Sequence, residues 1–77
     1  MLDRATLQKQ LATAEGHVVL GEQHLLRQEE IIARLESVGC GQSETARIAR
    51  ALLRQMERQL DGHMAEYDWL LEQLLQK

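Results

Sequence analysis

The segment Ser37-Val38-Gly39-Cys40-Gly41-Gln42-Ser43 lies in the middle of this 77-residue chain and separates two long segments with helical periodicity. Gly39 is a typical helix end, because glycine adopts the left-handed backbone of a helix C-terminus at low cost. Ser43 is a typical helix N-cap, and Glu44 follows it in the first turn. The segment therefore predicts the turn of a helical hairpin, with helices at about 3–37 and 43–76 and a turn at about 38–42.

Residues in both arms recur at alternating spacings of three and four, which is the pattern of a coiled-coil seam. The first arm carries Leu7, Leu11, Ala14, Val18, Gly21, Leu25, Gln28, Ile32 and Leu35. The second arm carries Ala46, Ala49, Leu53, Met56, Leu60, His63, Tyr67, Leu70, Leu74 and Lys77. We therefore expect an all-α fold, an antiparallel two-helix hairpin that forms one domain over residues 1–77.

The predicted register places small residues opposite large ones. Pairing Leu35 with Ala46 brings Gly21 opposite Leu60, and facing layers interdigitate when small and large side chains alternate. Gly16 and Gly21 each cost a helix about 1 kcal/mol relative to alanine. A break near Gly16 is thus the main alternative to a continuous first helix.

A further set of apolar residues lies off the seam and predicts an interface. The set, here called the Val19 flank, comprises Ala12, Val19, Leu26, Ala33, Met64, Leu71 and Leu75. Five more apolar residues lie elsewhere off the seam, namely Leu20, Ile31, Ile48, Leu52 and Trp69. One thin seam hides little apolar surface, and large exposed apolar patches usually mark interfaces. We expect a homodimer that closes into a four-helix bundle, with an unknown protein partner as a further option.

Acidic residues follow the first arm once per heptad, at Glu15, Glu22, Glu29 and Glu36. The register allows Glu29 to meet Arg50 across the hairpin, and Arg47 and Arg54 could reach this row from a second subunit. A solvated row of surface charges is the simpler interpretation, because exposed ion pairs contribute little.

Composition and charge limit the functional classes. The net charge is −3, one cysteine excludes an internal disulfide, and no apolar run approaches the ~18 residues of a membrane span. The start of the chain lacks a signal-peptide pattern. We expect a cytoplasmic protein without membrane association, and we interpret Cys40 as an incidental turn cysteine. Neither a phosphate-binding glycine loop nor a nucleophile motif occurs, so no catalytic residue, cofactor or enzymatic activity is expected.

Two alternative functions have residues to support them. The first is a small metal- or ligand-binding helical bundle that uses His17, His63 and Glu66. These residues fall near one another in this register and are types that bind divalent metals, although their spacing matches no known metal motif. Residues 27–58 hold six Arg and five Glu, for a net charge of +1, and the rest of the chain carries −4. A nucleic-acid-associated regulator could use this arginine-rich turn end, but no aromatic residues interleave with the arginines. Gln28 and His63 are simpler to interpret as polar residues that fix the register.

The two arms also resemble a known group of proteins. The motifs are His17-Val18, Gly21-Glu22, Arg27-Gln28, Ile31-Ile32, Leu35-Glu36-x-x-Gly39, Leu52-Leu53-x-x-x-Glu57-x-x-Leu60-x-x-His63 and Leu70-Leu71-x-x-Leu74. They are similar to those of short, uncharacterised bacterial two-helix proteins, which tend to carry a basic residue near Tyr67 and a turn about two residues shorter. The resemblance implies a bacterial cytoplasmic hairpin, and it assigns no particular activity to the chain. The favoured function is therefore a self-associating interaction or adaptor module.

Overall fold

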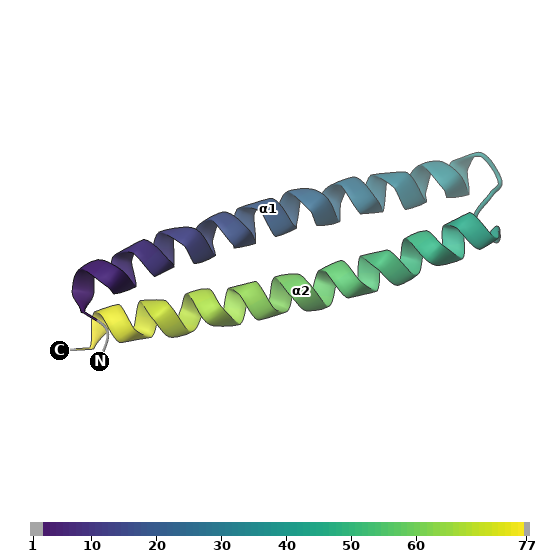
Figure 1. The fold of residues 1–77 in the computed structure, drawn as a ribbon. Coiled ribbons are helices and arrows are strands. Elements are labelled where there is room, and N and C mark those ends of the chain that lie inside the picture. Colours follow the sequence, from purple (N-terminus) through teal and green to yellow (C-terminus); the bar gives the residue numbers. More distant parts are fainter. Residues whose placement is uncertain (1–2, 77) are drawn as a thin grey trace.

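A computed structural model describes residues 3–76 as two long antiparallel helices joined by one tight turn (Figure 1). Helix α1 spans Arg4–Ser37 and helix α2 spans Glu44–Leu75, each within a residue of its predicted bounds. The Cα atoms occupy a rod of 56 × 14 × 13 Å. The all-α hairpin expected from the sequence is confirmed, and α1 runs without a break through Gly16.

Burial along the helices follows the predicted seam. Every seam position of α1 is buried or half-buried, and Thr6 is the one other residue of α1 that is not exposed. In α2 the seam positions within residues 44–75 are likewise covered, and Arg50, Leu71 and Gln73 are half-buried beside them. Lys77, the last predicted seam position, lies outside the described residues. The seam is thus the hydrophobic core of the hairpin.

A cluster of core residues lies at the end of the rod where α1 begins and α2 ends. Leu7, Ala14 and Leu70 form a buried cluster, and Leu11, Tyr67 and Leu74 pack against it, in agreement with the predicted pairing of these layers. Arg4 adds a contact across this end, because its Nη1 donates a hydrogen bond to the Leu74 carbonyl oxygen at 3.4 Å. These contacts fix the start of α1 against the end of α2.

Glycine at position 39 ends α1 in the way its sequence position predicts. Its φ of +82° lies in the left-handed region, the one positive φ among residues 3–76. The amide of Cys40 donates to the Leu35 carbonyl at 2.8 Å, and the amide of Gly39 donates to the Glu36 carbonyl at 3.1 Å. These two bonds form a Schellman motif, which satisfies carbonyl groups that the end of a helix leaves free.

Side-chain caps start both helices. The Ser43 hydroxyl accepts a hydrogen bond from the Ala46 amide at 3.1 Å and donates one to the Cys40 carbonyl at 2.7 Å. At the other end, the Asp3 carboxylate accepts a bond from the Thr6 amide at 2.7 Å, and this bond lowers the pKa of Asp3. The ionised cap therefore stabilises α1 fully when the pH is above the pKa that Asp3 has in the unfolded chain. This contribution is lost as the pH falls through the lower pKa that Asp3 has in the folded protein.

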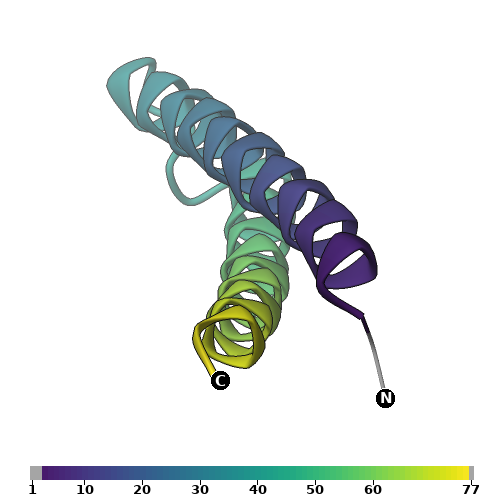
Figure 2. The same ribbon diagram turned by 90° about the vertical axis from the view of Figure 1, so that its left-hand side faces the viewer.

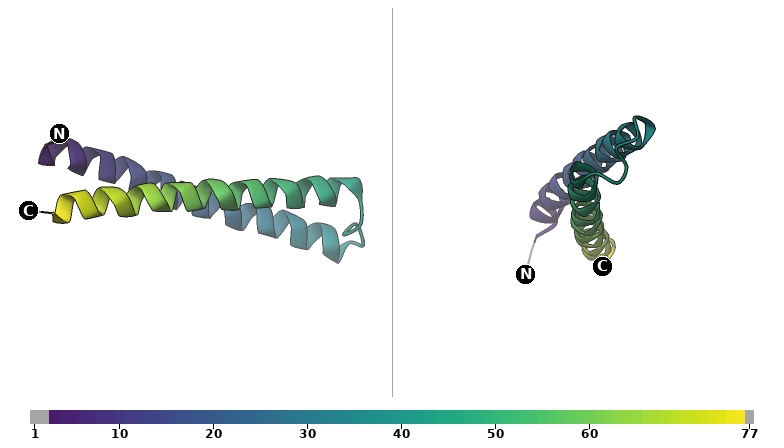
Figure 3. Two further views of the ribbon diagram at one scale, coloured as in Figure 1. Left: turned by 90° about the horizontal axis from the view of Figure 1, so that it is seen from below. Right: turned by 90° about the vertical axis from the view of Figure 1, so that its right-hand side faces the viewer.

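The two helices are inclined to each other, and Gly21 of α1 faces Leu60 of α2. Figures 2 and 3 show that α1 and α2 are inclined to each other and cross rather than run strictly parallel. A Cβ atom placed on Gly21 would lie 3.2 Å from Leu60 Cδ1, which is tighter than normal packing. The missing side chain of Gly21 thus lets the helices approach each other here, as the register predicted.

One polar residue is buried in the seam. Gln28 is 8% exposed, and its Nε2 donates a hydrogen bond of 2.8 Å to the carbonyl oxygen of Ala49 on the opposite helix. This bond satisfies a polar group that would be costly to bury without a partner. It also links the two helices at one layer, so Gln28 is suited to fix the register, as the sequence indicated.

Arg50 pairs with an acidic residue of α1 other than Glu29, which the register had placed within its reach. The Arg50 Nη2 atom instead lies 3.3 Å from Glu36 Oε2, one heptad nearer the turn. A long arginine side chain reaches over several residues, and in this case it folds back toward Gly41 and the end of α1. Both partners are partly exposed, so the pair contributes at most about 1 kcal/mol.

We predict opposite effects for substitutions at the two glycines of α1. Replacing Gly21 with leucine forces a side chain against Leu60 and should lower the free energy of unfolding by about 1–3 kcal/mol. Gly16→Ala is the control, because a Cβ at Gly16 meets nothing within 4 Å. It should raise the stability by up to ~1 kcal/mol through helix propensity. Urea unfolding followed by circular dichroism measures both, and equal stability of the Gly21→Leu variant and the parent would contradict the register.

We also predict that the buried side-chain amide of Gln28 contributes more to the free energy of unfolding than the exposed amide of Gln23. Gln28→Ala removes the bond to the Ala49 carbonyl and leaves a cavity in the seam, and it should cost about 1–3 kcal/mol. Gln23→Ala, at an exposed position of the same helix, should change the stability by less than about 0.5 kcal/mol. The same urea titrations compare the two, and equal losses would show that the interhelical bond contributes nothing.

Candidate functional site

The Val19 flank remains exposed along the hairpin. Val19, Leu26, Met64 and Leu75 are large apolar residues with exposed fractions of 48%, 61%, 47% and 73%. Ala12 and Ala33 are exposed as well, and Leu71 is half-buried at the edge of the seam. The residues predicted to form an interface are therefore accessible to a partner.

The opposite side of the hairpin carries a second apolar group, which the sequence analysis left unassigned. This group, here called the Trp69 flank, comprises Leu20, Ile31, Ile48, Leu52 and Trp69. All five are between 43% and 57% exposed. The sequence pattern that could have identified this group is the i, i+4 spacing of Ile48 and Leu52. In the register of the hairpin, Leu52 also lies at about the same height along the rod as Ile31 on the other helix. Both sides of the hairpin thus offer apolar surface.

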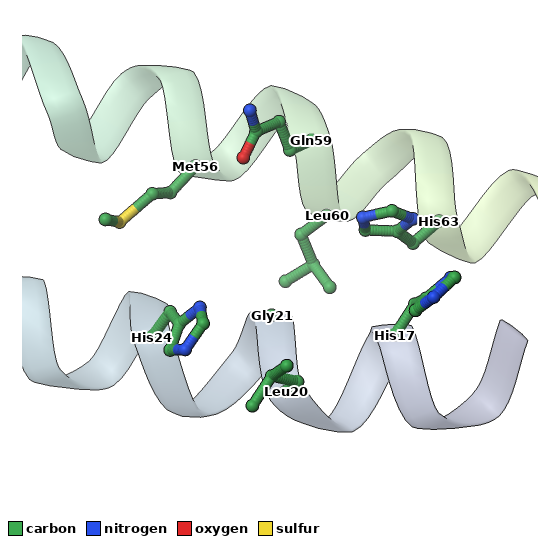
Figure 4. Close-up of a pocket in the computed structure, with 8 residues that line it drawn as sticks. All are labelled: His17, Leu20, Gly21, His24, Met56, Gln59, Leu60 and His63. Carbon is green, nitrogen blue, oxygen red and sulfur yellow. The ribbon is translucent and has the colours of Figure 1, made fainter. Parts of the chain in front are cut away.

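Two neighbouring hollows lie between α1 and α2 on the side of the Trp69 flank. The first, of about 200 Å³, is shown in Figure 4. It is lined by His17, Leu20, Gly21, His24, Met56, Gln59, Leu60 and His63. The second, of about 300 Å³, adjoins it through His17 and is lined further by Lys9, Gln10, Thr13, Ala14, Glu66, Trp69 and Leu70. Gly21 lines the first hollow, and Leu60, which packs against it, lines the same hollow.

Two of the three residues proposed for a metal site come together. The imidazole rings of His17 and His63 face each other across the helices, with centroids 5.1 Å apart and planes inclined by 46° (Figure 4). Glu66 lies in the second hollow and does not complete the site. Within residues 3–76, no three histidine, cysteine or acidic side chains are close enough to bind one metal ion. The structure therefore provides a histidine pair rather than the three-residue site.

The arginine-rich end has a mixed charge. Arg27 and Arg34 line a shallow hollow together with Glu30 and Ile31. Arg50 is engaged with Glu36, as described above. Cys40 is a free and exposed thiol in the turn. The acidic side chains among these arginines weaken the local positive field on which nucleic-acid binding depends.

Comparison of the chain with protein-family models, with curated proteins and with solved structures finds no match. In the described part of the chain, neither helix has a stretch long and apolar enough to span a membrane. The resemblance to short bacterial two-helix proteins stays a prediction. The functional proposal therefore depends on the geometry of the hairpin itself.

Proposed function

We propose that this chain is a non-enzymatic helical-hairpin protein that pairs with a second copy of itself and serves as an interaction or adaptor module. The observation that carries the proposal is the amount of large apolar surface that remains exposed beside a thin core. In residues 3–76, seven apolar residues are buried, whereas ten large ones are exposed. A second copy on the Val19 flank would cover part of this surface and build a four-helix bundle.

The apolar row of α1 is complementary to itself in an antiparallel contact. When two copies of α1 lie side by side in opposite directions, Val19 of one faces Leu26 of the other, and Ala12 faces Ala33. The two-fold axis of this contact passes α1 between Glu22 and Gln23. A self-complementary surface of this kind is the requirement for a two-fold symmetric dimer.

A row of charges on α2 is complementary to itself about nearly the same axis. Arg47, Arg54, Asp61 and Asp68 are exposed and spaced by seven residues, two basic and then two acidic. In an antiparallel contact of two α2 helices, Arg54 faces Asp61 and Arg47 faces Asp68. This axis passes α2 between Glu57 and Arg58. The pairing of Gly21 with Leu60 relates positions on α1 to positions on α2. By this relation, the two-fold axis indicated by the row on α1 and the one indicated by the row on α2 lie within about 2 Å of each other along the rod.

The charge distribution favours the same antiparallel arrangement. Residues 27–58, around the turn, carry a net charge of +1, and the remainder carries −4. An antiparallel dimer places the turn of one copy beside the open, acidic end of the other. Charges of this kind set the orientation and the specificity of an interface more than its affinity. The Trp69 flank would stay free on each copy, as an adaptor requires.

We predict that the protein is a dimer and that a charged residue introduced into the Val19 flank dissociates it into monomers. Size-exclusion chromatography with light scattering should give twice the chain mass of 8.8 kDa for the parent. Leu26→Glu should shift the mass to that of the monomer, because the contact would bury a charge without a partner. The Leu26→Glu monomer should remain helical by circular dichroism.

Ile31→Glu is the matched control, since it places the same charge on the same helix at an exposed position of the Trp69 flank. This variant should remain a dimer. A parent of single-chain mass at all concentrations would refute self-association. If Ile31→Glu dissociated the dimer and Leu26→Glu did not, the interface would lie on the Trp69 flank, and the proposal for the Val19 flank would be refuted.

We predict that the charge row on α2 controls the antiparallel pairing. Arg54→Asp places two acidic residues opposite each other at each of two symmetric contacts and should weaken dimerisation about tenfold. Adding Asp61→Arg restores opposite charges and should recover most of the affinity. Arg34→Asp, on the other side of the hairpin, is the control for a change in net charge. Sedimentation equilibrium measures the four dissociation constants, and failure of the double variant to recover would exclude this register.

A further inference from the structure

We propose that His17 and His63 form a two-histidine site for a divalent transition metal, with Zn²⁺ as the best fit, and that the bound ion links α1 to α2. The two residues come from different helices and lie at one layer of the hairpin. His63 is half-buried in the seam and His17 is exposed at its edge. Their side chains line the open hollow beside Gly21, so an ion has access to them (Figure 4).

The separation of the rings fits coordination of a single ion. A zinc–nitrogen bond is 2.0–2.1 Å long, and the centroid of an imidazole lies about 1.1 Å beyond its nitrogen, so each centroid is about 3.2 Å from the metal. For the tetrahedral angle of zinc, two such rings have their centroids about 5.2 Å apart. The rings of His17 and His63 are separated by 5.1 Å. The centroid separation therefore matches that of two imidazoles bound to one zinc ion.

Ring orientation can adjust to the metal without moving the backbone. The planes are inclined by 46°, and rotation about the Cβ–Cγ bond of histidine is soft. His17 and His63 make no hydrogen bond to another described side chain or to a carbonyl group that would hold either ring in place. Both imidazoles are therefore free to turn a nitrogen toward a common ion, with water in the remaining coordination positions.

The ligand type determines which ions the pair of rings would bind. Glu66 and Lys9 both line the second hollow, which adjoins the pair through His17, and neither is one of the two ligands. Nitrogen ligands of this type select zinc, copper and nickel over magnesium and calcium, which prefer oxygen. The site should thus ignore Mg²⁺.

Metal binding should stabilise the hairpin, because the site exists only when the two helices are paired. The inference does not depend on dimerisation, since both ligands belong to one chain. At a Zn²⁺ concentration about 100 times the dissociation constant, the melting temperature should rise by about 5 °C or more. Copper and nickel should act in the same direction, and Mg²⁺ at the same concentration should have no effect.

The test uses the full chain without a histidine tag, and it measures Zn²⁺ binding by isothermal titration calorimetry and thermal unfolding by circular dichroism. His17→Ala and His63→Ala should each weaken Zn²⁺ binding at least tenfold and abolish the shift in melting temperature. His24→Ala is the control, because His24 lines the same hollow but lies two helical turns from His17. This variant should bind Zn²⁺ like the parent.

NMR of the imidazole protons keeps the proposal testable if an alanine variant unfolds. Zn²⁺ should shift the resonances of His17 and His63 in the parent and leave those of His24 in place. The calorimetric stoichiometry should be one ion per chain. The proposal is refuted by an unchanged melting temperature at 1 mM Zn²⁺ (a chosen upper limit, about 100 times a 10 μM dissociation constant), by equal loss of binding in His24→Ala, or by one ion shared between two chains.

Discussion

Close approach of two helices along a single seam is the constraint on which this hairpin depends. Gly21 has no side chain to separate the backbones, and a Cβ at this position would press on Leu60 at 3.2 Å. Ala14, Ala46 and Ala49 extend the effect, since all three are buried and small. Helices that approach this closely exclude water from one narrow stripe and leave the rest of their surface outside. The long rod follows from this geometry.

The thin seam also explains where the polar residues and the hollow of this hairpin lie. Two polar residues occupy seam positions, the buried Gln28 and the half-buried His63. Gln28 finds a carbonyl partner across the helices, whereas His63 meets another imidazole. Gly21 and Leu60, which pack against each other in the core, also line the hollow beside the histidine pair.

Helical periodicity was sufficient to predict the fold, since the three-four spacing identified both seams and the pairing of Gly21 with Leu60. The glycine and serine of the turn located the helix ends. Side-chain positions beyond the seam could not be predicted in the same way. Arg50 binds Glu36 rather than Glu29, because a long flexible side chain near the turn has several acidic residues within reach. The Trp69 flank was missed because its residues follow no single heptad row. Glu66 falls in the adjoining hollow, a distinction that depends on rotamers rather than on spacing.

The position of the turn has a mechanical consequence. α1 begins and α2 ends at the same end of the 56 Å rod, where Arg4 is bonded to Leu74. A load applied between the start of α1 and the end of α2 would unzip the helices from that end, one layer after another, and would not shear the whole seam at once. Layers that yield in sequence resist less force than layers that break together. The cluster of Leu7, Ala14 and Leu70 lies where such a load first acts, and it would act as the latch of the hairpin.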